Sequence, residues 1–198
     1  MIEQLVSQRS QKVITFPDFV SCLALSKDNT ILAVGSATYD TNIYANIHLI
    51  DCYTLKITRT LKFHNKGIQS LSFSADGRYL ISVGNYRECT IGVWDPSSGQ
   101  LIASSYTLTN INEVKVKPYT RSGILEFVTV GADQVIQWIL TADAKLLNSE
   151  TFIHPKNTKT VELTTFSFVL VNERDYILLG SSEGILYYPP KTMNSSFL

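Results

Sequence analysis

The sequence predicts an all-β fold made by repeating one unit of short strands along the chain. A glycine follows an apolar or hydroxyl-apolar pair at intervals of 47 to 49 residues, at Gly35, Gly84, Gly131 and Gly180. A second marker recurs every 44 to 49 residues, beginning at Ile50, Trp94, Trp138 and Tyr187. A period of this size indicates an array of one supersecondary unit. We therefore expect function to lie on the surface of the array and not in a single pocket.

The second unit, about residues 64–107, shows the pattern most clearly. Its strand-like runs are predicted at residues 68–74, 79–84, 90–94 and 100–104. Gly77 lies in a turn between the first two runs, and a second turn begins at Asp95 and ends at Gly99. Four short antiparallel strands in about 45 residues make one blade of a β-propeller.

The same order of strands predicts three more blades. They cover about residues 17–61, 110–152 and 160–190, and the last stops at Pro189-Pro190, a pair that cannot donate to a strand ladder. Residues 1–16 are expected to hold an outer strand of a preceding blade, at 11–15. The whole chain, 1–198, is interpreted as one partial propeller of about three complete four-stranded blades plus a partial blade. Because propellers close with about 4–8 blades, we expect it to be part of a larger propeller.

Composition excludes several classes of function. Lys and Arg total 17, as do Asp and Glu, so the formal net charge is zero and the electrostatic footprint of a nucleic-acid binder is missing. No apolar run approaches the ~18 residues of a membrane helix, and the first residues lack a signal-peptide layout. Cys22, Cys52 and Cys89 are odd in number and match no zinc or redox spacing, which indicates free thiols. We expect a cytoplasmic protein without membrane or nucleic-acid partners.

No motif predicts an enzyme, a cofactor or a metal. His48 and His154 have no Cys, His or carboxylate at ligand spacing. The Ser-rich stretches at 97–99 and 181–184 lack the glycine-plus-Lys pattern of a phosphate loop and do not open a helix, so hairpin turns are expected there. The sequence therefore predicts no catalytic residue, no cofactor and no metal ligand.

The second blade resembles the WD-repeat family. Trp94-Asp95 is the dipeptide that names the family, and His64, Ser82, Glu88 and Trp94 stand where it places a structural tetrad. The resemblance implies a hydrogen-bonded chain through these four residues that ties a loop between blades to the sheet. Glu88 replaces the usual Asp and is one methylene longer. In the third blade Thr129 and Trp138 match, while Asp133 is displaced by one residue and Asn110 replaces the His.

Within that family, residues 11–190 look like the echinoderm microtubule-associated-protein-like group, the cilia- and flagella-associated WD-repeat proteins and related spindle scaffolds. The loop expected at residues 36–46, the run from Ser82 to Cys89 and the short loop at 131–134 carry this likeness. It implies a non-enzymatic scaffold in a microtubule-based assembly such as the axoneme or spindle. Its partners would be tubulin, axonemal or other cytoskeletal proteins, and its location the cytoskeleton of the cilium or flagellum.

Two alternatives stay open at this point. The chain could be a cytosolic signalling or assembly scaffold without microtubule contact, and it could complete its ring by self-association or by further sequence. Candidate partner-binding residues are Tyr39, Tyr44, Tyr86 and Arg87, which are expected in loops. Tyr and Arg are enriched at interface hot spots, although packing of these loops against neighbouring blades would also explain them.

Overall fold

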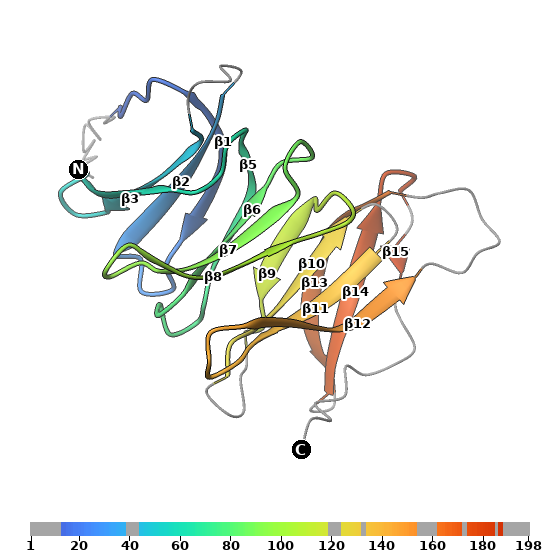
Figure 1. The fold of residues 1–198 in the computed structure, drawn as a ribbon. Coiled ribbons are helices and arrows are strands. Elements are labelled where there is room, and N and C mark those ends of the chain that lie inside the picture. Colours follow the sequence, from blue (N-terminus) through green and yellow to red (C-terminus); the bar gives the residue numbers. More distant parts are fainter. Residues whose placement is uncertain are drawn as a thin grey trace, which may run out of the picture.

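Four antiparallel sheets stand side by side in the computed structural model, from β1–β4, coloured blue to teal, at one end to the red β13–β15 at the other (Figure 1). The structure describes residues 13–38, 44–118, 124–131, 134–153, 162–171, 174–184 and 186–187. These residues form strands, turns and loops and no helix, so they include no helix of the length and apolarity that a membrane span needs. The prediction of an all-β fold is confirmed.

The strand bounds follow the repeat. The first sheet holds β1 Phe19–Leu25, β2 Ile31–Ala37, β3 Asn46–Asp51 and β4 Ile57–Lys62. The second holds β5 Ile68–Phe73, β6 Leu80–Gly84, β7 Thr90–Asp95 and β8 Gln100–Tyr106. The third holds β9 Glu113–Val116, β10 Glu126–Gly131, β11 Gln134–Leu140 and β12 Leu146–Ile153. The last holds β13 Leu163–Val171, β14 Arg174–Ser181 and β15 Leu186–Tyr187.

Each sheet is a meander in which neighbouring strands follow one another in the chain. The pairing of third and fourth strands is interrupted by a bulge at equivalent places in three sheets, at Leu49/Ile50, Val93/Trp94 and Gln137/Trp138. A bulge increases the local twist of a strand. The bulges therefore recur with the sequence repeat, as the strands do. We refer to the four sheets, in chain order, as blades 1 to 4.

The core lies between blades, because the middle strands are covered on both faces. In blade 2, Leu80 and Trp94 pack against blade 1, whereas Ile81 and Val93 pack against blade 3. Blade 3 divides in the same way, since Phe127 belongs to the cluster shared with blade 2 and its neighbour in sequence Val128 to the cluster shared with blade 4. Successive side chains of a strand point to opposite faces, which explains why these strands are apolar without alternation.

The first strands of the four blades lie next to one another along the inner side of the array. Side chains bridge them: the Ser70 hydroxyl accepts from the amide of Val114 at 3.2 Å, and the Ser21 hydroxyl donates to the carbonyl of Ile68 at 2.6 Å. Between blades 3 and 4 the Glu113 carboxylate accepts from the amide of Phe166 at 2.8 Å. These bonds join strands that belong to different sheets and so hold the blades in register.

Two expectations are corrected at the ends of blade 1. Ser36 and Ala37 belong to β2 and Asn46 to β3, so the connection covers 38–45 and not 36–46. The Ser36 hydroxyl accepts from the Asn46 amide at 2.8 Å, which extends the contact between the two strands. The outer strand predicted at 11–15 is not formed by residues 13–16. Instead, the ring of Phe16 stacks on His48 with centroids 5.3 Å apart; residues 11 and 12 lie outside the described chain.

Candidate functional site

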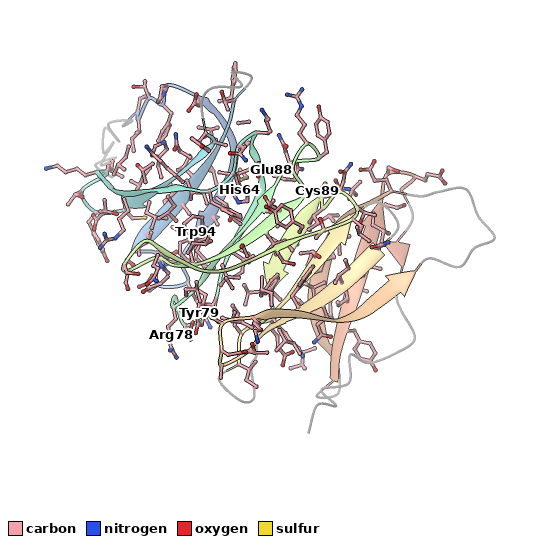
Figure 2. All side chains as sticks on the ribbon, viewed as in Figure 1. His64, Arg78, Tyr79, Glu88, Cys89 and Trp94 are labelled. Carbon is pink, nitrogen blue, oxygen red and sulfur yellow. The ribbon has the colours of Figure 1, made fainter. Side chains whose placement is uncertain are left out.

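The four tetrad positions of blade 2 come from two strands and two loops. His64 lies between β4 and β5, Ser82 in the middle of β6, Glu88 in the loop from β6 to β7, and Trp94 near the end of β7. The side chains of His64 and Glu88 are 1% and 8% exposed, and Ser82 is fully buried. Figure 2 labels His64, Glu88 and Trp94 on the blade 2 ribbon. We call the end of the sheets at which His64 and Glu88 lie the His64 end.

The structure brings the four side chains into one hydrogen-bonded chain. The indole N–H of Trp94 donates to the Ser82 hydroxyl at 2.8 Å, and that hydroxyl lies 2.7 Å from Nε2 of His64. Nδ1 of His64 contacts Oε1 of Glu88. The indole N–H of Trp94, the Ser82 hydroxyl and both ring nitrogens of His64 are thus hydrogen-bonded, as burial of a polar group requires. The chain connects the loop before β5 with the loop before β7 through two strands.

The Glu88 carboxylate also binds the backbone of the neighbouring loop. Oε2 accepts from the amides of Asn65 at 2.6 Å and Lys66 at 3.1 Å, and Oε1 accepts from the Thr90 hydroxyl at 2.9 Å. Burial raises the pKa of this carboxyl group, but the hydrogen bond and charge of His64, the Asn65 amide and Thr90 together outweigh burial and hold the pKa below its usual value of 4.5. The Glu88 carboxylate is therefore held in place and connects the loop before β7 to the loop before β5.

Thr90 and Gly84 belong to this site although the spacing of the tetrad did not indicate them. The Thr90 hydroxyl lies 2.9 Å from Nδ1 of His64. A Cβ at Gly84 would meet Cγ of Glu88 at 2.6 Å, so only glycine leaves room for the longer acid. A hydroxyl residue two positions after the acid, at the start of the strand, is the signal that could have identified Thr90.

Ser82, His64 and Glu88 have the connectivity of a catalytic triad, but their surroundings prevent that chemistry. A nucleophilic serine must reach a substrate carbonyl, whereas Ser82 is 0% exposed and its oxygen already accepts from Trp94. His64 is held on both ring nitrogens by Ser82, Thr90 and Glu88. The network can hold loops in place, but it has no opening for a substrate.

Blade 3 contains a shorter version of the network. The indole N–H of Trp138 donates to the Thr129 hydroxyl at 2.9 Å, and both side chains are buried. Asn110 does not extend this pair; its side-chain oxygen is 3.4 Å from the Cys89 sulfur. Asp133 lies outside the described residues. Blade 3 therefore retains the bond from Trp to hydroxyl, while Asn110 links its loop to blade 2.

The candidate partner-binding residues lie at the His64 end where they are described. Tyr44 is 57% exposed and directly precedes Ala45, whose amide donates to the His64 carbonyl at 2.9 Å. Tyr86 is 62% exposed, and Arg87 beside it is also exposed. Tyr39 lies outside the described residues. Three of the four candidates thus stand on loops of blades 1 and 2 that border the buried network.

At the opposite end, which we call the Asp95 end, the acid of the Trp-Asp dipeptide forms a turn. The Asp95 carboxylate accepts from the hydroxyls of Ser97 and Ser98 at 2.6 and 2.7 Å and from their amides at 2.8 and 3.3 Å. These hydrogen bonds lower the pKa of Asp95 to about 2. The stretch at 97–99 is therefore a carboxylate-capped hairpin turn, with Gly99 at φ 79°.

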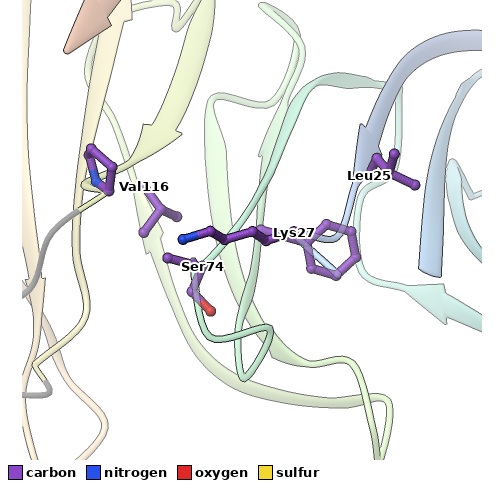
Figure 3. A pocket seen from close by; sticks show the side chains of 7 residues that line it. Leu25, Lys27, Ser74 and Val116 are labelled. Carbon is purple, nitrogen blue, oxygen red and sulfur yellow. The ribbon is translucent and has the colours of Figure 1, made fainter. Parts of the chain in front are cut away.

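A cavity of about 250 Å³ lies at the Asp95 end, where β1, β5 and β9 finish (Figure 3). It is lined by Leu25, Lys27, Phe73, Ser74, Ala75, Val116 and Pro118. Lys27 is its one charged lining residue and extends toward Ser74 and Val116. The Ser74 hydroxyl already donates to Asp76 at 2.6 Å. Within the described residues, no group of three or more His, Cys, Asp and Glu could hold a metal ion.

Comparison with known families identifies the repeat. Residues 10–44 and 55–95 match the family described as WD domain, G-beta repeat. This match shows that the chain contains WD40 repeats, and the four propeller-type sheets agree with it. WD40 propellers in general are non-enzymatic scaffolds that mediate protein–protein interactions.

Several relatives named for cilia or for WD repeats are similar to this chain. It is 24% identical over 187 residues to WD repeat-containing protein 90 of Xenopus tropicalis, covering 93% of the chain and 10% of that protein. It is 36% identical over 103 residues to cilia- and flagella-associated protein 52 of Chlamydomonas reinhardtii, covering 52% and 17%. The Bos taurus protein of that name is 26% identical over 175 residues, covering 87% and 27%. The chain thus spans only a small part of each relative.

Solved structures show the same fold. The β-propeller domain of Myceliophteria thermophila Cps50 (Swd1) superposes with a TM-score of 0.68 at 19% identity, covering 90% of this chain and 53% of that one. The structure of U3-55K gives a TM-score of 0.65 at 18% identity, covering 89% and 48%. The four blades correspond to about half of each of these chains, so the prediction of a partial propeller agrees with both.

Proposed function

We propose that this chain is a non-enzymatic interaction scaffold whose setting is a microtubule-based assembly such as the ciliary or flagellar axoneme. The observation that carries the scaffold function is the exposure of Tyr44, Tyr86 and Arg87 on loops that a buried network holds in place. Loops on a rigid framework are common sites of recognition, because little ordering is needed on binding. The same network is sealed from substrates, which supports a role without catalysis.

The microtubule setting is supported by relatives named cilia- and flagella-associated protein 52 and centriole proteome protein 16. Under this proposal the partners are tubulin, axonemal or other cytoskeletal proteins, and the location is the cytoskeleton of the cilium or flagellum. Tyr39, Tyr44, Tyr86 and Arg87 are the proposed contact residues. Tyrosine suits such a contact because it offers a large amphipathic surface with few rotatable bonds.

Co-sedimentation with polymerised tubulin tests both parts. The Tyr39→Ala/Tyr44→Ala double variant should weaken binding by more than about 1 kcal/mol, the usual threshold of a hot spot, without lowering thermal stability. Tyr53→Ala is the matched control, because Tyr53 is 79% exposed in the turn from β3 to β4 at the Asp95 end. Absence of sedimentation by the unmodified chain would instead favour a scaffold without microtubule contact.

A further inference from the structure

Two loops at the His64 end of blade 2 are tied into one surface. The loop from β6 to β7 meets the segment after β8, where the Thr107 amide donates to the Cys89 carbonyl at 2.8 Å. The Thr107 hydroxyl lies 3.1 Å from the same carbonyl and 2.9 Å from that of Thr109. The hydrogen bonds of Thr107 therefore join the two loops at this end of blade 2.

Large side chains stand uncovered on this pair of loops. Tyr86 is 62% exposed, Tyr106 78% and Leu108 fully exposed. We define these three residues with Arg87 as the Tyr86 platform. Tyr106 and Leu108 flank Thr107, and Tyr86 lies three residues before the Cys89 that Thr107 binds. The hydrogen bond from Thr107 to Cys89 joins the two loops, and exposed apolar side chains on adjoining loops mark an interaction site more often than scattered ones do.

Arg87 is already oriented on the platform. Its Nε donates to the Tyr86 hydroxyl at 3.1 Å, and its Cζ lies 5.4 Å from the centre of the Tyr86 ring. The two terminal amino groups of the guanidinium have no carboxylate partner among the described residues. A guanidinium matches the two oxygens of a carboxylate. Because Tyr86 fixes the orientation, less side-chain entropy is lost when such a partner binds.

The charges around the platform favour an acidic partner. Lys62 ends β4 and Lys66 precedes β5 at the same His64 end, and neither makes an ion pair with a described carboxylate. The carboxylate nearest in sequence, Glu88, faces inward with 8% exposure and is occupied by His64 and two backbone amides. The described loops of blades 1 and 2 at the His64 end therefore present Lys62, Lys66 and Arg87 beside apolar rings, although the whole chain is neutral.

We infer that the Tyr86 platform binds an acidic segment of a partner protein in which Asp or Glu flanks a large apolar residue. The carboxylate pairs with the terminal amino groups of Arg87, and the apolar side chain packs against Tyr106 and Leu108. The inference rests on the proposed scaffold function and specifies the chemistry of the partner at that site.

The same blade offers a matched control at its other end. Arg78 lies 5.7 Å from the ring centre of Tyr79, which resembles the geometry of Arg87 and Tyr86. Figure 2 shows Arg78 and Tyr79 at the opposite end of the blade from Glu88 and Cys89. Tyr79, however, packs partly against the core between blades 2 and 3. Arg78→Glu makes the same change of charge without touching the platform.

The experiment measures binding of a fluorescent peptide, Glu-Glu-Leu-Glu-Glu, to the full chain by anisotropy at low salt. Arg87→Glu should weaken binding at least about ten-fold, since a hydrogen bond to a charged group is lost and repulsion replaces it. Leu108→Ser should weaken binding several-fold, while Arg78→Glu should leave it unchanged. Replacing Glu by Gln in the peptide, or Leu by Ser, should reduce binding by the unmodified chain.

Equal loss in Arg78→Glu and Arg87→Glu would overturn the inference, because binding would then follow net charge. So would equal binding of the Gln peptide, or tighter binding of a phosphoserine peptide that lacks Glu. Peptide binding by a chain that does not co-sediment with microtubules supports the platform and overturns only the microtubule setting. Co-sedimentation without peptide binding supports the microtubule setting and overturns the inference about the platform.

Discussion

Glu88 shows how one residue can depart from a family pattern and still make its contacts. The longer side chain needs space that Gly84 provides, since a Cβ there would lie 2.6 Å from Cγ of Glu88. The extra length lets one carboxylate reach both His64 and the amides of Asn65 and Lys66. The acid thus fixes the loop before β5 and the loop before β7 together.

Energetic coupling between His64 and Glu88 is the first prediction. In a double-mutant cycle with His64→Ala and Glu88→Ala, measured by denaturant unfolding, the two changes should deviate from additivity by about 0.5–3 kcal/mol, as is usual within one hydrogen-bond network. Arg78→Ala combined with Glu88→Ala is the control and should be additive, because Arg78 lies at the other end of the blade. Additive effects of His64 and Glu88 would make His64 an ordinary loop residue.

The lowered pKa of Glu88 gives a prediction on acid stability. A carboxyl group with a lower pKa in the folded state contributes stability that is fully present above its unfolded value of about 4.5 and is lost as pH falls through the folded pKa. The free-energy advantage of the wild-type chain over Glu88→Gln should therefore shrink below pH 4.5. Urea unfolding of both proteins between pH 3 and 7 measures it. An advantage that grows on acidification would contradict the prediction.

The positions of the tetrad could be predicted from sequence through the resemblance of the second blade to the WD-repeat family. Thr90 was not predicted, although its place two positions after the acid is a signal for it, because its contacts with Glu88 and His64 form only in the folded chain. His48 shows the same limit: its Nδ1 lies 3.0 Å from the Thr60 hydroxyl, while Nε2 is buried beneath Phe16 and has no hydrogen-bond partner among the described residues. Burial and desolvation lower the pKa of His48, although Asp18 opposes this effect. Only the folded chain brings these groups together.

At the scale of elements, one turn design recurs at the Asp95 end. In residues 74–78 the Ser74 hydroxyl donates to Asp76 and accepts from the amide of Tyr79 at 2.9 Å, and Gly77 has φ 72°. Residues 141–145 form a similar turn that is one residue shorter: the Thr141 hydroxyl donates to Asp143 and accepts from the amide of Lys145 at 3.1 Å, and Ala144 occupies the left-handed position at φ 60°. The turn is thus set by the hydroxyl and acid, and the fourth residue adapts to it.

These two turns give a reciprocal prediction. Ala144→Gly should stabilise the chain and Gly77→Ala should destabilise it, each by about 1 kcal/mol, the usual cost of the left-handed conformation for a residue with a Cβ. A Cβ at Gly77 would meet no atom within 4 Å, so backbone strain alone is tested. Differential scanning calorimetry of both variants measures the effect. A shift of the same sign in both would show that strain does not control these turns.

Strands were predicted more accurately than the ends of loops, for a physical reason. Apolar runs define strands wherever a blade is covered on both faces, as in β6 and β10. The ends depend on single contacts between distant residues, such as the bond from the Asn46 amide to Ser36. Before β1, the ring of Phe16 packs on His48, and Pro17 has no amide hydrogen to donate to a ladder. Neither the bond between Asn46 and Ser36 nor the packing of Phe16 on His48 can be recognised from the sequence.

At the scale of the whole molecule, the array has an uncovered face on its first blade. Among the described strands, β5 lies between β1 and β9, whereas β1 has a blade on one side only. Phe19, Leu23 and Leu25 of β1 are 68%, 60% and 50% exposed. The comparable solved propeller chains are about twice as long as the part that this chain matches. Additional blades, or a second copy, would bury the apolar side chains of β1.

The chain of 198 residues is therefore expected to self-associate when it is prepared alone, because burial of apolar surface favours association by about 25 cal/mol per Å² and open strand edges add to it. Sedimentation velocity should show an average mass that rises with protein concentration. The double variant Phe19→Lys/Leu23→Lys should lower that mass toward the monomer. Leu108→Ser, which removes an even more exposed apolar residue from the His64 end of blade 2, should leave it unchanged. A monodisperse monomer at every concentration, unfolding in one cooperative transition, would show that four blades are stable without a cover on β1.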